Sequence, residues 1–388
     1  MFGKTITLFK LFGFAVRIDL SWLIILALVV WSLAGVIFPS QFEGLHWGAY
    51  LAMGLVAALG LFASIVFHEL CHSLVARRYG MPMKGITLFI FGGVAEMGEE
   101  PPGPKAELLM AVAGPLASLV VAGIFLGLWW VGALLAWPKT ATAVLRWIGL
   151  INAILVAFNL IPGFPLDGGR ILRAALWHQK GDLRRATQTA SKVGAGFGMV
   201  LIVLGIFNLL LLHPLGGLWW ILIGMFIRAA ARQGYQQVLV RQALQGEPVR
   251  RFMSDEPVTV SGDTSVERLV EDYVYRHHFK MFPVTDDGRL AGCVTTRDVK
   301  DVPREQWTQR RVADIARVCT DENTIAADED AMRALSRMSH GQVSRLLVVE
   351  GDRLVGVLSL KDLLEFLSLK IELESDLPGP GKPLGVSK

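Results

Sequence analysis

The sequence predicts a polytopic α-helical membrane protein of about six transmembrane helices, joined to an α/β domain at its C-terminal end. Of its 388 residues 53% are hydrophobic and 19% are charged, and the apolar residues form long uninterrupted blocks that a soluble core would not need. These blocks fill roughly the first 235 residues. The rest has the composition of a soluble domain and contains a repeated stretch. We therefore expect a transmembrane domain over residues 1–240 and a soluble domain after it.

The candidate spans are each about as long as a helix that crosses a bilayer. They are residues 18–38, 48–76, 106–136, 144–162, 193–213 and 215–235. Lysine and arginine gather before the first span, after the second and after the fourth, whereas the opposite loops hold only Lys139 and Arg146. The positive-inside rule then places both termini and the soluble domain on the cytoplasmic side of a cell membrane. The alternative, that the first span is a signal peptide, lacks a convincing cleavage site.

Neither the net charge nor the cysteine pattern predicts a nucleic-acid-binding protein or a protein stabilised by disulfides. The formal net charge of +4 follows from the uneven loops, so we infer no nucleic-acid partner from it. The three cysteines show no pairing pattern and argue against a disulfide framework.

A metal-binding motif stands at the end of the second span. His68 and His72 are one helical turn apart, so both imidazoles lie on the same face, about 6 Å apart along the axis, and can reach one metal ion. Glu69 lies beside that ion, where a carboxylate can take a proton from water acidified by the metal. Burying these groups in lipid without a ligand or water would cost several kcal/mol. The pattern predicts zinc, although such ligands accept other divalent metals.

A catalytic zinc usually has three protein ligands, so this motif lacks one. Residues 159–169 end the fourth span with two prolines that break the helix, glycines that permit tight backbone, and the carboxylate of Asp167 at membrane depth. We expect Asp167 to be the third ligand. Glu96 is the competing donor, and the alternative role for Asp167 is to cap a helix that opens at Gly168.

Together the two motifs resemble those of the site-2 proteases, peptidase family M50. These are zinc metalloproteases embedded in membranes that cut transmembrane segments of other proteins. The resemblance implies that His68, His72 and Asp167 bind one Zn²⁺ and that Glu69 is the catalytic base. It also implies that Asn159 helps to hold the substrate or the developing oxyanion, and that the substrates are single-span membrane proteins.

Residues 85–97 favour strand, with Gly92-Gly93 at an expected hairpin turn close to the zinc site. Apolar strand backbone cannot expose unpaired amides to lipid, so the hairpin should lie against protein. Its free edge would then pair with an unwound substrate, and the alternative is a packed loop without substrate contact. In the third span we expect Gly114 and Ser118 to serve helix packing alone, and Glu107 to face water or Lys105.

The soluble domain contains an internal repeat. Residues 282–298 align with residues 346–362 at an offset of 64. Each copy predicts a strand, a tight turn, a second strand, and a helix opened by Thr or Ser with Asp in its first turn. The pair resembles tandem cystathionine-beta-synthase (CBS) domains, with repeats expected over 245–305 and 306–372.

CBS domains are cytosolic modules that commonly bind adenine nucleotides. The resemblance implies that Thr295 and Ser359 contact the phosphates of ATP, ADP or AMP, and that Asp298 and Asp362 contact the ribose. The sequence leaves open whether two chains pair as a homodimer through these domains. Ordinary helix capping accounts for the same four residues equally well.

One other class of function fits the polar residues in lipid. A metal-ion transporter or channel regulated by the CBS domains would line its ion path with the two histidines and Asp167. This alternative does not explain why Glu69 directly follows His68. Residues 375–388, rich in proline and glycine, predict a disordered tail.

Overall fold

The computed structural model describes residues 5–97, 100–211, 214–286, 289–341 and 343–375. Apart from Ser375, the predicted disordered tail lies outside these ranges. The chain divides into two compact units, Met1–Gln236 and Gln237–Lys388, and each is described by itself.

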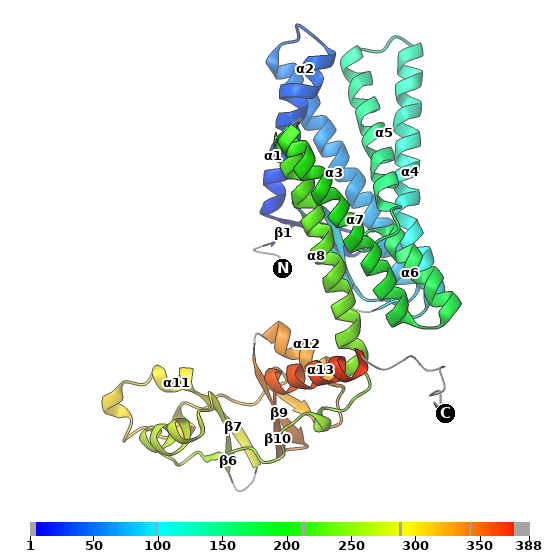
Figure 1. Ribbon diagram of the computed structural model, residues 1–388. Coiled ribbons are helices and arrows are strands. Elements are labelled where there is room, and N and C mark those ends of the chain that lie inside the picture. The colour runs from blue at the N-terminus through cyan, green and yellow to red at the C-terminus, as the bar shows by residue number, and fades with distance from the viewer. Residues whose placement is uncertain (1–4, 98–99, 212–213, 287–288, 342, 376–388) are drawn as a thin grey trace, which may run out of the picture. The chain divides into compact units, whose positions relative to one another are not determined.

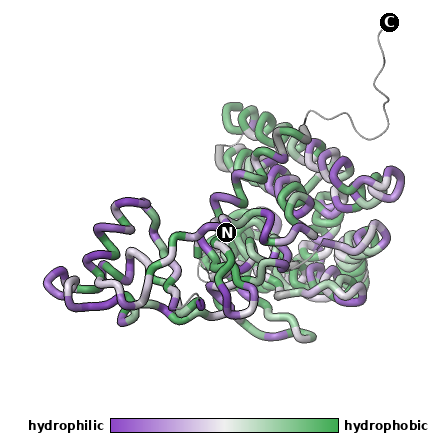
Figure 2. The backbone as a smooth tube through the Cα atoms, turned by 90° about the horizontal axis from the view of Figure 1, so that it is seen from below, coloured by the Kyte–Doolittle hydropathy of each residue, from purple (hydrophilic) through white to green (hydrophobic). Residues whose placement is uncertain are grey.

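The first unit is built from long apolar helices (Figure 1). In the part of the chain that the structure describes, five helical segments are long and apolar enough to cross a membrane. They are Ser21–Gln41, formed by α1 (Ser21–Ser32), a π-helical turn (Leu33–Ile37) and α2 (Phe38–Gln41), then α3 (Trp47–Arg78), α4 (Pro104–Leu134), α5 (Lys139–Asn159) and α7 (Leu183–Leu211). The sixth predicted span lies within α8 (Pro214–Leu244). Hydrophobic residues, green in Figure 2, recur through this helical unit, and the five apolar segments confirm the predicted polytopic helical class.

Helices α3, α4 and α5 pack closely because small residues line their contacts. Ala57, Ala111 and Gly114 are among the buried positions, and small side chains allow helix backbones to approach. After α5 the two prolines stop the helix, and a short loop leads into α6 (Asp167–Lys180). Gly181 follows the last residue of α6, and its φ of 66° is the left-handed conformation common at helix ends.

A four-stranded sheet in the order β1-β2-β3-β4 lies at one end of these helices. Its strands are β1 (Thr5–Leu11), β2 (Phe14–Asp19), β3 (Met83–Phe89) and β4 (Gly92–Met97). Strands β2 and β3 are parallel, and the two hairpins are antiparallel. The sequence prediction missed β1 and β2.

The β3–β4 hairpin has the predicted location but not the predicted turn. Phe89 pairs with Gly92, so Ile90 and Phe91 form the turn, and the two glycines open β4 instead. Strand β3 is also not an edge, because β2 pairs with its other side. Among the described strands the free edge on this side of the sheet belongs to β4.

The second unit contains a six-stranded sheet in the order β5-β6-β7-β10-β9-β8. Its strands are β5 (Val260–Ser261), β6 (Met281–Asp286), β7 (Arg289–Thr295), β8 (Thr324–Ala326), β9 (Arg345–Glu350) and β10 (Arg353–Ser359). Its helices are α9 (Val266–Arg268), α10 (Tyr275–His277), α11 (Thr296–Lys300), α12 (Ala331–Gly341) and α13 (Leu360–Ser375). Each repeat gives a parallel outer pair and an antiparallel hairpin, and the hairpins β6–β7 and β9–β10 meet through β7 and β10.

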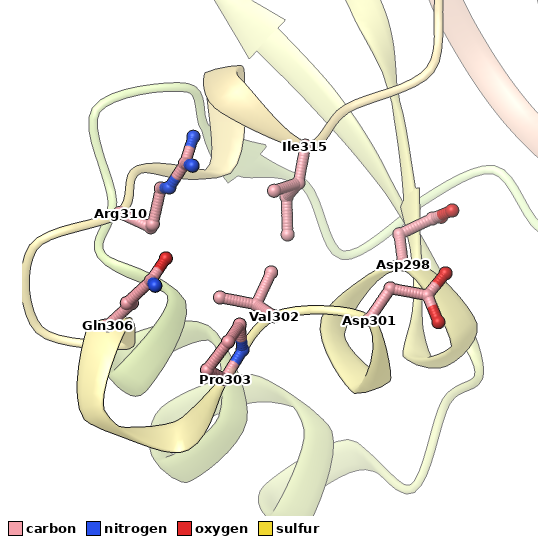
Figure 3. A pocket seen from close by; sticks show the side chains of 7 residues that line it. All are labelled: Asp298, Asp301, Val302, Pro303, Gln306, Arg310 and Ile315. Carbon is pink, nitrogen blue, oxygen red and sulfur yellow. The ribbon is translucent and has the colours of Figure 1, made fainter.

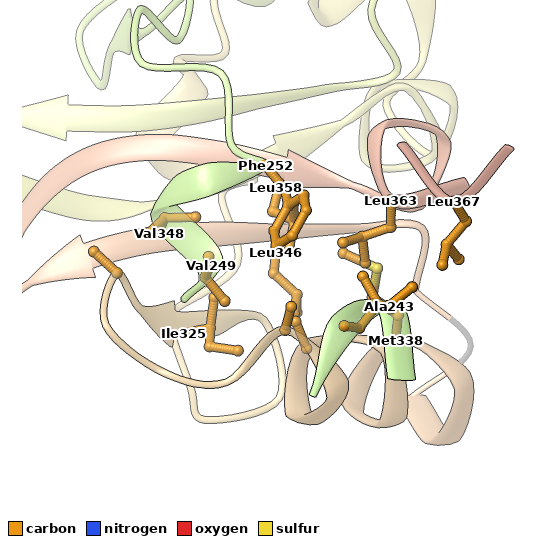
Figure 4. Close-up of a cluster of buried hydrophobic side chains, with 14 residues drawn as sticks. Ala243, Val249, Phe252, Ile325, Met338, Leu346, Val348, Leu358, Leu363 and Leu367 are labelled. Atoms are coloured by element: carbon orange, nitrogen blue, oxygen red, sulfur yellow. The ribbon is translucent and has the colours of Figure 1, made fainter. Parts of the chain in front are cut away.

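Each repeat has its own apolar core. In the second repeat Leu346 and Leu358 of the hairpin lie towards Leu363 of α13, and Val348 lies beside Val249 (Figure 4). The first repeat buries the equivalent positions of β6 and β7 in a separate cluster. The alternating burial of these strands explains why the repeat was visible in the sequence.

Candidate metal centre

Three side chains converge where α3 meets the start of α6. Nε2 of His68 lies 3.1 Å from Nε2 of His72 and 3.1 Å from Oδ2 of Asp167. Nε2 of His72 lies 3.3 Å from Oδ1 of the same carboxylate. Four tetrahedral ligand atoms at zinc bond lengths of 2.0–2.1 Å stand about 3.3 Å apart. The three side chains therefore fit one zinc ion. Among the described residues they form a cluster of ligand-type side chains close enough together to hold a metal ion.

The opposite nitrogens of both imidazoles are held by α4. Nδ1 of His72 donates to the Met110 carbonyl oxygen at 2.6 Å, and Nδ1 of His68 lies 2.9 Å from the Ser118 hydroxyl. A carbonyl can only accept, so Nδ1 of His72 carries a proton, and in the neutral ring the lone pair is then on Nε2, facing the centre. Such outer contacts fix the tautomer and orientation of a metal-binding histidine.

Gly114 leaves room for these rings. A Cβ atom at this position would lie 2.1 Å from Nε2 of His72 and 2.5 Å from Nε2 of His68. Both separations are far below van der Waals contact, so no larger residue fits between α4 and the two nitrogens. The expectation that Gly114 and Ser118 serve helix packing alone was wrong, because Gly114 borders the two imidazoles and Ser118 contacts His68.

Glu69 lies next to the hairpin. A Cβ added to Gly93 of β4 would be 3.0 Å from Cγ of Glu69 and 2.9 Å from the Ile65 side chain, so the strand passes directly over this helix face. Asn159 is the last residue of α5 and is half-buried. The backbone of Glu96 pairs with Gly85, and its side chain lies outside the described part of the chain.

Glu107 does not face water or Lys105, contrary to the sequence-based expectation. Its side chain is fully buried, and Oε1 accepts hydrogen bonds from the guanidinium group of Arg173 in α6. A buried carboxylate needs a partner, and this one comes from a helix that the sequence did not connect with it.

In the CBS repeats the four predicted nucleotide contacts form two capping boxes. Thr295 Oγ1 accepts from the Asp298 amide at 3.3 Å, and Asp298 accepts from the Thr295 amide at 2.8 Å. Ser359 and Asp362 make the same exchange at 3.2 Å and 2.9 Å. Capping therefore occurs at all four residues, and it leaves nucleotide binding open.

The capping box of the first repeat is joined by an arginine and a cavity formed with residues that follow this repeat. Nε of Arg317 donates to Oδ1 of Asp298 at 2.7 Å. Burial acts to raise the pKa of Asp298, but hydrogen bonds from Thr295 and Arg317 outweigh it and hold the pKa below its usual value. A cavity of about 320 Å³ adjoins this carboxylate, with acidic side chains on one side and Arg310 on the other (Figure 3). Its lining residues are Asp298, Asp301, Val302, Pro303, Gln306, Arg310 and Ile315.

Comparisons with known proteins match both units. The model of peptidase family M50 matches residues 56–137 and 131–203, and the CBS domain model matches residues 249–305 and 312–369. The Rip3 protein of Mycobacterium tuberculosis, named as a zinc metalloprotease, is 36% identical over 94% of this chain and 93% of its own. A zinc metalloprotease of Methanocaldococcus jannaschii is 29% identical over 96% of this chain and 98% of its own. The solved site-2 protease of that organism, 28% identical, covers 60% of this chain and 95% of its own with a TM-score of 0.43.

The chain therefore belongs to peptidase family M50 and carries a C-terminal pair of CBS domains. It is a zinc metalloprotease and a multi-pass membrane protein. Both resemblances inferred from the sequence are confirmed, and the enzyme reading is favoured over the transporter.

Proposed function

We propose that this protein is an intramembrane endopeptidase that cuts the transmembrane segments of single-span membrane proteins. The observation that carries the proposal is the convergence of His68, His72 and Asp167 on one point within the apolar helices. Bound there, Zn²⁺ would polarise the scissile carbonyl and lower the pKa of a water molecule to about 7. The basic loops support placing both termini and the CBS domains in the cytoplasm, with the enzyme in the cell membrane.

The residues around the three ligands have separate roles in the proposed reaction. Glu69 takes the proton of the attacking water and passes it to the leaving amine, as its position beside the two histidines allows. Ser118 and the Met110 carbonyl keep the imidazoles oriented during this transfer. Asn159 is assigned to holding the substrate carbonyl, because it ends α5 shortly before the loop that delivers Asp167.

A transmembrane helix hides its carbonyl groups, so the substrate must be extended before it is cut. The free edge of β4 offers backbone hydrogen bonds to such a segment. Gly93 brings this strand against Glu69, so a segment paired with β4 would run close to the catalytic base.

The test compares Glu69→Gln with the wild-type protein in proteoliposomes that contain a single-span substrate. The variant should keep its zinc, because Glu69 is not a ligand, and should lose cleavage. Glu43→Gln, which changes an exposed carboxylate, is the matched control and should cleave normally. Full cleavage by Glu69→Gln would contradict the assignment of the base.

We also propose that an adenine nucleotide binds the CBS pair and modulates cleavage, and that two chains associate through these domains. The cavity beside Asp298 lies at the small end of the range for ligand sites, about 300–1,000 Å³. Calorimetry of the full chain with ATP, ADP and AMP tests the binding. Asp298→Asn and Asp362→Asn should each remove the heat from one repeat, and the absence of heat with all three nucleotides would contradict the proposal.

A further inference from the structure

A buried ion pair lies close to the metal centre without belonging to it. Glu107, in the first turn of α4, is fully buried, and its partner Arg173 in α6 has a side chain only 6% exposed. Buried ion pairs are costly, and apolar residues of similar volume often stabilise a protein at least as well. Stability alone therefore does not explain why these charges stand here.

Arg173 joins three separate segments. Its Nε donates to Oε1 of Glu107 in α4, and its terminal nitrogen lies 3.4 Å from Oε2 of Glu100, in the segment before α4. Its guanidinium group also stacks over the ring of Phe164 at 4.9 Å from the ring centre. Phe164 belongs to the loop that leads from α5 to Asp167.

The two helices that this pair connects carry complementary parts of the metal centre. Helix α4 holds the imidazoles through Met110 and Ser118, and α6 begins at Asp167. Arg173 lies about 9 Å along α6 from Asp167, and Glu107 about 4.5 Å along α4 from Met110, at 1.5 Å per residue. Contact between these side chains therefore sets the position of α6 against α4, and with it the carboxylate against the imidazoles.

We propose that Arg173 is a positioning residue for the metal centre and that Glu107 is the partner through which it acts. Ligand distances in a metal site are held to about 0.2 Å, so a small slide of α6 would spoil the geometry. Arg rather than Lys is required, because a planar guanidinium group can contact two carboxylates and stack on a ring at once. This inference rests on the proposed assignment of the three ligands.

The test measures the metal centre itself in purified full-length protein. Arg173→Met should weaken zinc binding about tenfold in competition with a chelator, the low end of the effect of disturbing groups around metal ligands. With Co²⁺ in place of zinc, the absorption bands of the variant should shift. Arg173→Lys should be intermediate in both measurements. Arg185→Met removes an exposed arginine paired with Asp182 and should leave both unchanged.

The double variant Glu107→Met with Arg173→Met separates positioning from stability. It removes both charges, so its melting temperature should recover relative to Arg173→Met, while weak zinc binding and the altered Co²⁺ spectrum should persist. A double variant with wild-type zinc affinity and a wild-type Co²⁺ spectrum would overturn the inference. This measurement tests the positioning role even if the single variant Arg173→Met does not fold. If the wild-type protein bound no zinc, the proposed ligand set would fail, and this inference with it.

Discussion

Gly114→Ala should empty the metal centre without unfolding the protein. The new Cβ would stand 2.1 Å from Nε2 of His72, whereas nonbonded heavy atoms need about 3.5 Å. The ring, or α4, must therefore move by roughly 1.4 Å, several times the tolerance of about 0.2 Å for a metal ligand. A local change of backbone angles cannot relieve this contact, because Gly114 lies inside α4. We expect zinc affinity to fall by about a hundredfold or more, beyond the usual effect of outer contacts.

The fold should tolerate the same change. Alanine is favoured over glycine inside a helix by roughly 0.5–1 kcal/mol, so the substitution does not weaken α4 itself. Gly123→Ala is the matched control, because it lies on the same helix and its Cβ would meet nothing within 4 Å. The assay is zinc content and chelator competition on both variants, alongside their melting temperatures. Wild-type zinc binding by Gly114→Ala would refute the geometry of the site.

Three further predictions concern other parts of the protein. Ser118→Ala should weaken zinc binding about 10–100-fold in chelator competition, because His68 loses the partner of its Nδ1. Successive amides of β4 point to opposite sides of the strand, so one of the two substitutions Val94→Pro and Ala95→Pro removes an amide from the free edge. That variant should reduce cleavage while its zinc content stays normal. Asp298→Asn should lower the melting temperature at neutral pH. Because the folded pKa of Asp298 is depressed, its stabilisation is present above the unfolded pKa, about 3.9, and is lost as pH falls through the folded pKa.

Each of these has a result that would count against it. Unchanged zinc affinity in Ser118→Ala would mean that the hydroxyl does not orient the ring. Normal cleavage by both proline variants would exclude pairing of substrate with β4. A melting difference between wild type and Asp298→Asn that persists unchanged below pH 2 would show that it does not arise from ionisation of this carboxyl group.

The sequence predicted the parts of the site that depend on local spacing. His68 and His72 share a helix face because they are one turn apart, and they converge in the structure. Asp167 was expected from an apolar span broken by prolines, and it lies against both histidines. The hydrophobic blocks and the repeat at an offset of 64 likewise predicted the polytopic helical class and the pair of CBS domains, because burial follows residue periodicity within each element.

The contacts that the sequence missed all depend on tertiary packing. Ser118 reaches His68 across 50 positions, and nothing in a small-residue pair distinguishes helix packing from support of a ligand. Glu107 was expected to face water or Lys105, because its partner Arg173 stands 66 positions later. A usable signal did exist for Glu107, since a carboxylate near an apolar span suggests a buried partner.

The hairpin errors have a similar origin. Strand β2 shows the alternating burial of a strand, with Phe14, Val16 and Ile18 buried, but no strand was expected there, because the first span was expected to begin at residue 18. Without β2, strand β3 was expected to be a free edge. The turn was assigned to Gly92 and Gly93 from composition, whereas Gly93 is required for close approach to Glu69.

X-ray absorption at the zinc edge tests the central claim most directly, because it reports the ligands of the bound metal. For the purified wild-type protein we predict two imidazole nitrogens and carboxylate or water oxygen at about 2.0–2.2 Å. The Asp167→Ala variant should lose zinc affinity and one oxygen ligand. A wild-type spectrum with sulfur ligands, or with no histidine contribution, would contradict a zinc site formed by His68, His72 and Asp167.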